Sequence, residues 1–381
     1  MIIKPIVRMV LRIASFVLYG LTILSAYCGH INPAITAIPA VMVMMMPYLA
    51  ILTALTAVAW LVSGKWITGA LGIGSLIAAS APILSAVPLK LSNNPTDGKT
   101  EFSVMSWNCL HGWDQKLMTG RSDRPQNQLY NESLEFMLNS GADIICLQEM
   151  EQWEESEVPR LTQDFKEKFA VLYRYESHEA GKDTRVFSKY PVHNLPARQL
   201  AERNGVKLPD DWRMLLKYYS FYRVNIDGRR LLLVNMHLYS PGLSDKEREV
   251  ITDIRGTETV KASAREFKNS ILGKMRNAFS VQARQLELLC EILKDYKDPI
   301  VVCGDMNNVP ESYTWRVMTR NGFKDAYSEV GFGHLITYNK HLFWLHLDQI
   351  MYRGALRPLN VKKDRIKTSD HFPLTATFEF E

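Results

Sequence analysis

Acidic, amide and imidazole side chains stand at the ends of several short apolar runs from Glu101 onward. Oxygen-bearing groups suit a hard divalent cation, and imidazoles suit proton transfer. When such groups follow several strands, they can meet in one cleft that is built on a rigid sheet. The candidate residues are Asn108, Glu149, His237, Asp305, Asn307, Asp348, Asp370 and His371.

Two of these runs can be read side chain by side chain, because alternate residues of a strand point to the same side. In the run at 300–307, Asp305 and Asn307 fall on one side, so we expect them to be presented together. In the run at 143–149, Glu149 falls on the same side as Ile145 and Leu147 and emerges at the end of the strand.

Strand-like runs alternate with helical patterns throughout residues 101–381, which is typical of a mixed α/β domain. The sequence contains neither a Gly-x-Ser-x-Gly motif nor a cysteine-nucleophile signature. Its five cysteines include no Cys-x-x-Cys pair, so we expect free, buried thiols and neither a disulfide framework nor a zinc site.

Six short segments occur in a fixed order: Trp-Asn-Cys at 107–109, Leu-Gln-Glu at 147–149, Asn-Met-His-Leu at 235–238, Gly-Asp-Met-Asn at 304–307, Leu-Asp-Gln-Ile at 347–350 and Ser-Asp-His at 369–371. Each segment alone is weak, but the ordered set resembles the endonuclease/exonuclease/phosphatase superfamily. That superfamily includes pancreatic-type deoxyribonuclease, abasic-site endonucleases, neutral sphingomyelinases and inositol-polyphosphate 5-phosphatases. The resemblance covers roughly 101–381 and implies a four-layer α/β sandwich, in which two packed, mostly antiparallel sheets are flanked by helices.

The resemblance implies hydrolysis of phosphodiester or phosphomonoester bonds with Mg²⁺, for which Mn²⁺ could substitute. A phosphodiester is anionic and resists attack by hydroxide, and a hard cation that retains water neutralises the phosphate and the leaving oxygen. The implied metal ligand is Glu149, with Asn108 beside it. Asp370 would bind the metal directly or through water.

The resemblance also implies roles for the remaining candidates. Asp305 would orient or deprotonate the attacking water, and Asn307 would hydrogen-bond the phosphate or the nucleophile. His371 would donate to a phosphoryl oxygen or act as a base, and Asp348 would orient its imidazole and favour the protonated form. His237 would bind the transition state or protonate the leaving group.

Three further features leave alternatives open. Many superfamily members carry Arg two residues before the orienting Asp, where this chain has His346.

The charged segment Leu243–Phe279 is either a solvated helical excursion or a cover for the cleft, and a helix is expected over Val281–Leu293. Four aromatic residues could stack on bases or sugars, although core or surface positions suit them better: Trp212, Tyr218, Tyr219 and Tyr239.

Three long apolar runs precede the α/β domain: Ile13–Cys28, Ala34–Ser63 and Trp66–Val87. Each approaches or exceeds the roughly 20 residues that cross a bilayer, and a cleaved signal peptide would explain only one of them. We therefore expect about three transmembrane helices in residues 1–90, with spans near 8–28, 34–63 and 66–87. A linker would follow at 91–100, and the catalytic domain would occupy 101–381. Two spans, or a re-entrant second segment, are the alternatives.

Basic residues predict the orientation. Lys4, Arg8 and Arg12 favour a cytoplasmic N-terminus, the loop at 29–33 has no Lys or Arg, and Lys65 lies between the second and third runs. Three crossings would place the catalytic domain on the extracytoplasmic side, with the chain integral to a prokaryotic plasma (inner) membrane.

Charge and anchoring leave the substrate open. The formal net charge of +5 is confined to the first 100 residues, so the remainder carries no net charge that would favour nucleic acid. A nuclease-like substrate is slightly favoured, and a phospholipid or sphingomyelin headgroup is the alternative. A non-catalytic, membrane-bound binding protein on the same fold is a further alternative. The partners expected are therefore a phosphodiester substrate and the lipid bilayer, and the sequence indicates no protein partner.

Overall fold

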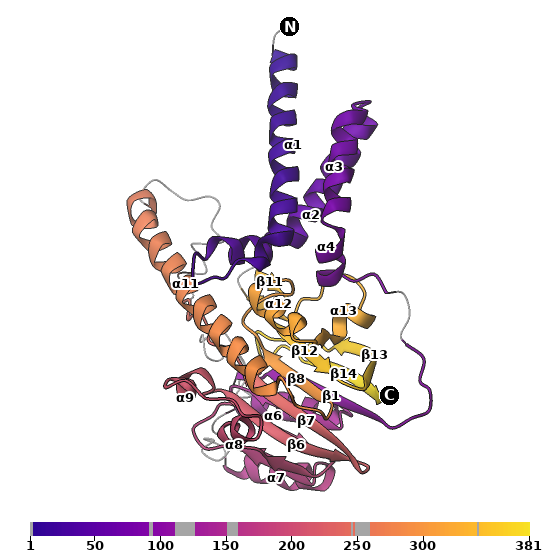
Figure 1. Cartoon of the computed structure of the whole chain (residues 1–381), viewed down its shortest axis with the longest axis vertical. Helices are drawn as coiled ribbons and strands as arrows, with labels where there is room; N and C mark the ends of the chain where they lie inside the picture. The colour runs from indigo at the N-terminus through magenta and orange to yellow at the C-terminus, as the bar shows by residue number, and fades with distance from the viewer. Residues whose placement is uncertain are drawn as a thin grey trace.

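The computed structural model describes residues 3–90, 94–110, 126–150, 159–244, 247, 260–340 and 343–381. Apolar helices protrude from one end of an α/β domain, with the N-terminus at the far tip (Figure 1). The helical part comprises α1 (Ile3–Tyr27), the 3-10 helix η1 (Cys28–His30), α2 (Ile38–Val62), α3 (Trp66–Ala78) and α4 (Ser80–Ala86).

Two six-stranded sheets form the centre of the α/β domain. The first has the order β13-β14-β1-β2-β4-β3, in which β1 and β2 run parallel and the other neighbours antiparallel. Its strands are β1 (Glu101–Asn108), β2 (Ile144–Gln148), β3 (Tyr175–His178), β4 (Arg185–Ser188), β13 (Leu356–Lys363) and β14 (Leu374–Phe380).

The second sheet has the order β5-β6-β7-β8-β12-β9, in which β7 and β8 run parallel and the other neighbours antiparallel. Its strands are β5 (Val192–Asn194), β6 (Tyr219–Ile226), β7 (Arg229–His237), β8 (Ile300–Asp305), β9 (Lys324–Asp325) and β12 (Asp348–Arg353). A separate hairpin joins β10 (Tyr338–Lys340) to β11 (Phe343–Leu345).

Strand alternation divides the apolar side chains among the layers. Val104 of β1 packs with Leu233 of β7 in the core between the sheets. Met105, the next residue of β1, packs instead with Leu134 of the outer helix α6. Leu232 of β7 likewise belongs to the opposite core, beneath α11. The expected four-layer α/β sandwich is therefore confirmed.

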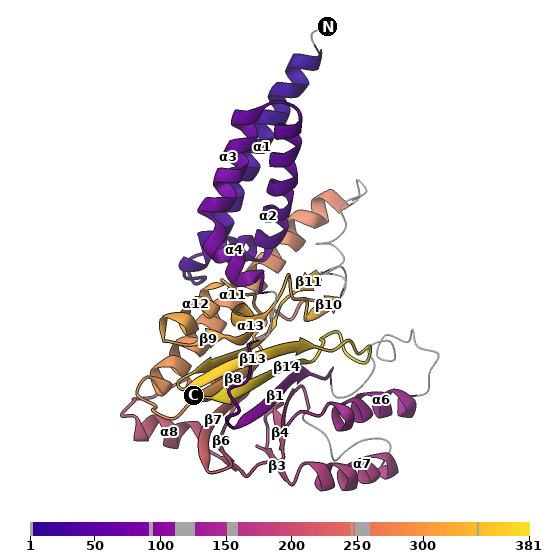
Figure 2. The same cartoon turned by 90° about the vertical axis from the view of Figure 1, so that its right-hand side faces the viewer.

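Helices cover the outer face of each sheet (Figure 2). The first sheet is covered by α6 (Gln126–Asn139) and α7 (Pro159–Leu172). The second is covered by α8 (Ala197–Arg203), α9 (Trp212–Leu215), α11 (Val260–Leu293) and α12 (Tyr313–Arg320), and the short α13 (Ala326–Val330) follows β9. The helix expected over Val281–Leu293 therefore begins at Val260, within the long charged segment.

Two of the three expected spans are continuous helices that are long and apolar enough to cross a membrane: Pro5–His30 and Ile38–Val62. The third run is divided, because α3 and α4 meet at a bend of 62°, although the pair passes the same test. Pro82 explains the break, since its ring clashes with the carbonyl of Ala78 in a continuous helix. Tyr27 Oη donates to that carbonyl oxygen at 2.7 Å.

The end of the helical part that contains η1 is attached to the α/β domain. Asn32 Nδ2 donates to Tyr313 Oη at 3.2 Å, and an Arg320 guanidinium nitrogen lies 2.8 Å from His30 Nδ1. On α2, Tyr48 Oη donates to the carbonyl oxygen of the hairpin residue Trp344 at 2.5 Å. The helices are thus packed directly against the domain.

Candidate active site

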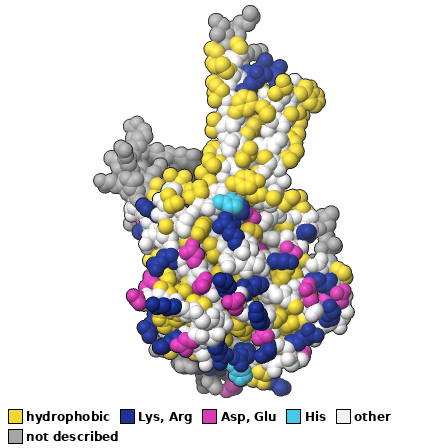
Figure 3. All heavy atoms as spheres, viewed as in Figure 1, with side chains coloured by type: hydrophobic (Ala, Val, Ile, Leu, Met, Phe, Trp, Pro, Cys, Tyr) yellow, Lys and Arg dark blue, Asp and Glu magenta, His cyan; other side chains and the backbone are white. Residues whose placement is uncertain are grey.

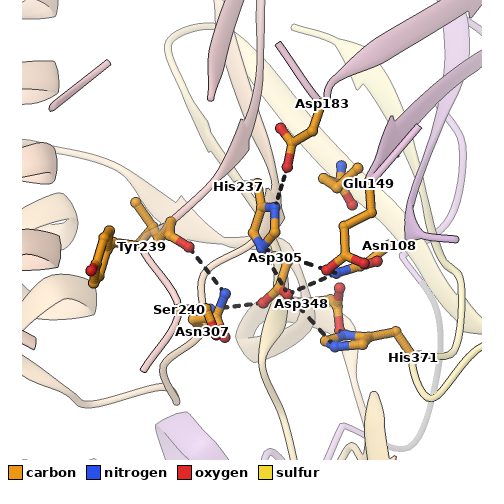
Figure 4. Close-up of polar contacts among 12 residues, drawn as sticks. Asn108, Glu149, Asp183, His237, Tyr239, Ser240, Asp305, Asn307, Asp348 and His371 are labelled. Carbon is orange, nitrogen blue, oxygen red and sulfur yellow. Dashed lines mark hydrogen bonds and ion pairs between the residues drawn. The ribbon is translucent and has the colours of Figure 1, made fainter. Parts of the chain in front are cut away.

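Strand register brings three of the expected residues into one row. In the parallel pair β7–β8, His237 lies opposite Asp305, and in the antiparallel pair β12–β8, Asp348 lies opposite the same residue. From the other sheet, β1 ends at Asn108, whose Nδ2 donates to Asp305 Oδ2 at 3.1 Å. The strand ends of both sheets therefore meet at Asp305 (Figure 4).

Glu149 reaches this row through a left-handed backbone conformation. Strand β2 ends at Gln148, and Glu149 has a φ of 55°, which is uncommon for a residue with a side chain. Ile145 and Leu147 pack toward the outer helices, whereas Glu149 Oε1 accepts a hydrogen bond from Asn108 Nδ2 at 2.9 Å. The turn at Glu149, and not strand alternation, directs its carboxylate into the site.

Asp305 and Asn307 lie together, but β8 ends at Asp305, so a turn and not strand alternation places Asn307. The backbone N–H of Asn307, which has a φ of 45°, donates to Asp305 Oδ1 at 2.8 Å. The side-chain amide of Asn307 donates to the carbonyl oxygen of Leu238 at 3.0 Å. Gly304 must lack a side chain, because a Cβ there would lie 1.7 Å from the carbonyl oxygen of Met236.

His371 is held between two carboxylates. Its Nδ1 lies 2.8 Å from Asp348 Oδ2, and its Nε2 lies 3.6 Å from Asp305 Oδ2. Burial by itself would lower the pKa of His371, but Asp348 and Asp305 outweigh it and raise that pKa to about 10. The imidazole is therefore protonated at neutral pH and directs one N–H toward Asp305.

His237 has a partner that the sequence motifs did not reveal. Its Nδ1 lies 2.6 Å from Asp183 Oδ2, while its Nε2 lies 3.7 Å from Asp305 Oδ2 and 4.0 Å from Glu149 Oε1. Burial would lower the pKa of His237, but Asp183, Asp305 and Glu149 raise it to about 9. Asp183 precedes β4, and its only sequence signal is an acidic residue just before an apolar strand.

These side chains surround one cavity of about 310 Å³. Six of the eight expected residues line it: Glu149, His237, Asp305, Asn307, Asp370 and His371. Asn108 and Asp348 are buried beside these residues and hydrogen-bond to them. Asp370 lies 3.9 Å from Lys340 Nζ, and Lys340 also lines the cavity.

Two groups of side chains could hold a divalent cation. The possible ligand atoms of Asp305, Asp348 and His371 lie within 4.8 Å of one another. However, His371 and Asp348 already bond to each other in a fully buried position, which leaves little room for an ion and its waters. Glu149 and Asp305 both face the cavity, which suits a hard cation that retains water.

Asn108 connects the second group. Its amide nitrogen donates to both Glu149 and Asp305, while its Oδ1 accepts from the backbone N–H of Leu110 at 3.3 Å. In this orientation the amide orients the two carboxylates. Binding a metal through its oxygen would require the amide to be turned over.

A buried amide pair ties the two sheets together directly behind the site. Gln148 Nε2 donates to Asn235 Oδ1 at 2.7 Å. Asn235 Nδ2 in turn donates to the carbonyl oxygens of Leu147 and Arg185, each at 3.0 Å. These bonds fix the strand ends that carry Glu149 and His237.

The remaining expectations have definite outcomes. All five cysteines are free and buried, as expected. His346 is fully buried, which lowers its pKa to about 3, and it lies edge-on to Tyr327. Tyr219 is a core residue and Trp212 packs against the same core, whereas Tyr218 lies with its ring 6.0 Å from that of His237 and Tyr239 is exposed.

The helical part also contributes to the cavity. Met44 of α2 is one of its lining residues, together with Met275 and Phe279 of α11. No local signal in the sequence connects Met44 with the catalytic residues, because the contact joins segments that are far apart along the chain. The 243–279 segment contributes through Leu243, Met275 and Phe279, so part of it does border the cleft.

Comparison with known proteins agrees with the resemblance that the sequence motifs indicate. A family model described as Endonuclease/Exonuclease/phosphatase family matches residues 105–371, and a domain of unknown function matches residues 8–85. No curated protein matches the chain.

Three solved structures are among those to which this chain is similar, each with a TM-score below 0.5. Truncated TDP2 from Caenorhabditis elegans is 18% identical, with 73% of this chain and 98% of that chain covered and a TM-score of 0.42. The human Nocturnin catalytic domain with bound sulfate is 18% identical, with coverages of 76% and 98% and a TM-score of 0.44. The endonuclease/exonuclease/phosphatase from Bacteroides vulgatus is 13% identical, with coverages of 74% and 100% and a TM-score of 0.46.

The enzymes of this family depend on divalent metal ions, and this chain presents the carboxylates of Glu149 and Asp305 to the cavity. The matching family model spans well over half of the chain. The chain therefore belongs to the Endonuclease/Exonuclease/phosphatase family and is a hydrolase that acts on phosphoester bonds.

Proposed function

We propose that this protein is a membrane-anchored, Mg²⁺-dependent phosphodiesterase whose catalytic domain lies on the extracytoplasmic side of a prokaryotic plasma membrane. The observation that carries the proposal is the convergence of Glu149, His237, Asp305 and His371 on one cavity. Apolar helices long enough to cross a bilayer support the anchoring.

Glu149 is the proposed principal metal ligand, with Asn108 positioning it and Asp370 contributing directly or through water. Oxygen donors that line an open cavity fit a hard ion that keeps part of its hydration shell. When bound, Mg²⁺ would neutralise charge on the phosphate and on the leaving oxygen, and Mn²⁺ would substitute for it.

The protein groups divide the remaining chemistry. Hydrogen bonds from Asn108 and Asn307 orient the Asp305 carboxylate, which then orients the attacking water and accepts its proton. The neighbouring carboxylates raise the pKa of both histidines above the ordinary value, which favours the protonated imidazoles. They are therefore suited to donate hydrogen bonds to phosphoryl oxygens or to the leaving oxygen.

Each histidine is oriented by its own carboxylate. Asp348 fixes the ring of His371, and Asp183 fixes the ring of His237. The Asn307 side chain lines the same cavity and would contact the phosphate or the nucleophile. The sequence slightly favours a nuclease-like substrate, whereas the apolar residues that line the cavity favour the phospholipid alternative.

The test is hydrolysis of bis-p-nitrophenyl phosphate by the full chain in detergent micelles. We expect turnover with Mg²⁺ or Mn²⁺ and its loss in excess EDTA. Asp305→Asn and His371→Gln should each lower kcat by about a hundredfold or more. His193→Gln changes an exposed histidine on β5 and should retain activity.

Two results would contradict this function. One is a folded full chain that gives no turnover with either metal. The other is turnover that is the same in Asp305→Asn and His371→Gln as in the unaltered chain. Either result would favour the alternative of a non-catalytic, membrane-bound binding protein.

A further inference from the structure

The catalytic cavity has a polar side and an apolar side. The carboxylates and imidazoles described above form the polar side, at the strand ends. Six apolar side chains also line the cavity: Met44, Leu243, Met275, Phe279, Leu345 and Leu347. All except Leu243 belong to the two apolar clusters that share Met44. We call these six residues the apolar wall. A phosphate held by the polar side would have one of its substituents against the apolar wall.

Part of the apolar wall comes from a helix that can cross a membrane. Met44 belongs to α2, and its neighbour Val43 packs with Val309, Tyr338 and Leu347 of the catalytic domain. One turn earlier, Ala40 packs against Phe279. The first turns of α2 are therefore built into the wall of the site.

The cavity lies at the level where the helices would enter the bilayer. From Met44 to the end of α2 at Val62, the helix rises roughly 27 Å at about 1.5 Å per residue, which is close to the thickness of a hydrocarbon core. Hydrophobic side chains cover the protruding helices and the adjoining rim of the domain (Figure 3). Exposed rim residues include Phe332 (61%), Leu89 (58%) and Trp344 (46%). A tryptophan in such a rim is typical of the membrane–water interface.

Cationic side chains are few among the described residues that line the cavity. Among the described residues that line it, Lys340 is the only lysine or arginine, and it is close to Asp370. A nucleic acid strand presents a phosphate at every nucleotide, and its binding depends on several basic contacts and on aromatic stacking. A single phosphate attached to an apolar group matches this cavity better.

We propose that the substrate is an amphiphilic phosphoester that enters from the bilayer, with its aliphatic chain against the apolar wall and its phosphate at Glu149, Asp305 and His371. This proposal rests on the phosphoester hydrolysis proposed above and names its substrate class. A lipid phosphodiester and a long-chain alkyl phosphomonoester share this chemistry. In the reaction, the oxygen of water bonds to phosphorus, the bond from phosphorus to the leaving oxygen breaks, and that oxygen takes a proton.

The test compares substrates that differ only in chain length. Methyl p-nitrophenyl phosphate and hexadecyl p-nitrophenyl phosphate present the same leaving group to the full chain in mixed micelles. We expect kcat/KM to be at least about tenfold higher for the hexadecyl ester, because burial of each methylene is favourable. Hexadecyl phosphate and methyl phosphate, assayed by release of inorganic phosphate, distinguish a monoesterase from a diesterase.

Matched variants separate contact with the wall from simple partition into micelles. Met44→Ser and Met275→Ser should lower the ratio of hexadecyl to methyl kcat/KM severalfold. Met45→Ser and Leu272→Ser change exposed residues of the same two helices that do not line the cavity, and should preserve the ratio. Partition alone would give the same ratio in all four variants, which would overturn the proposal.

The failure of this proposal can be distinguished from the failure of the proposed function. Equal kcat/KM for the methyl and hexadecyl esters would overturn the amphiphilic substrate while leaving phosphodiesterase activity established. Faster cleavage of a single-stranded oligonucleotide than of the hexadecyl ester would also overturn it, in favour of a nuclease. Failure to cleave any ester, bis-p-nitrophenyl phosphate included, would remove the phosphoesterase function itself.

Discussion

At the scale of single residues, the sequence predicts which groups converge better than it predicts how they are held. The end of an apolar run identified Asp305, because polar residues that follow such runs share an edge of a sheet. The Ser-Asp-His segment identified His371. The conformation of Glu149 could not be predicted, since a left-handed φ there depends on tertiary contacts. Asp183 was missed for a similar reason, because its bond to His237 links residues 54 positions apart.

Asp183→Asn should reduce turnover of bis-p-nitrophenyl phosphate by about tenfold to a hundredfold. In the unaltered chain, the Asp183 carboxylate fixes the His237 ring and raises the pKa of that imidazole. Because the change removes this charge, the His237 pKa should fall below its value of about 9 in the metal-free chain. Turnover measured against pH and an NMR titration of His237 in EDTA would check both effects.

Asp183→Glu provides the control for the positioning role, because it keeps the charge. We expect it to restore part of the turnover and to keep the His237 pKa above the ordinary value. If Asp183→Asn turned over substrate at the unaltered rate, the carboxylate would have no part in catalysis. An unchanged His237 pKa would show that Asp305 and Glu149 suffice to hold the proton.

At the scale of elements, the two sheets follow from strand alternation and the long helix does not. Buried strands such as β7 and β8 are short apolar runs that end in polar residues. By contrast, α11 extends through a highly charged stretch with little apolar content, where periodicity gives a weak signal. Packing of Phe279 and Met275 against α2 explains part of that extension, and such tertiary contacts are not visible in a local pattern.

The buried amide pair between the sheets should be important for stability. Asn235→Ala removes one acceptor and two donated hydrogen bonds from a fully buried position. It leaves the Gln148 side chain and two carbonyl oxygens without these partners, so we expect destabilisation by about 2–3 kcal/mol. That corresponds to a fall in Tm of roughly 5–10 °C for a domain of this size.

Asn225→Ala is the matched control, since Asn225 is an exposed residue of β6 in the same sheet. Thermal unfolding of both variants in the same detergent would check the difference. Equal Tm values for the two variants would mean that the amide pair contributes nothing net to the joining of the sheets.

At the scale of the whole molecule, the sequence predicts a helical part and a catalytic part. It does not predict that both parts line the catalytic cavity. Hydropathy identified the apolar runs, and the motifs identified the catalytic domain. The contact of Met44 with the cavity arises only when the two parts are assembled. The bend between α3 and α4 is also an assembled feature, since the Ala78 carbonyl freed by Pro82 bonds to Tyr27 of α1.

The assembly also bears on topology. The η1 end of the helices contacts the catalytic domain through His30 and Asn32. If only α1 and α2 crossed the bilayer, the domain would follow on the side opposite to η1, and these contacts could not form. We therefore expect α3 and α4 together to complete a third crossing, with the turn at Lys65 in the cytoplasm.

Reporter fusions would check this arrangement. Alkaline phosphatase, which is active only outside the cytoplasm, should be active when fused after Glu381. Green fluorescent protein fluoresces when it stays in the cytoplasm and is dark when it is exported unfolded across the membrane. It should therefore be fluorescent when fused after Lys65 and dark when fused after Glu381. Fluorescence after Glu381 would place the catalytic domain in the cytoplasm. Because η1 contacts that domain, the loop at 29–33 would then also be cytoplasmic. The N-terminus would lie outside the cytoplasm, contrary to the orientation that Lys4, Arg8 and Arg12 predict.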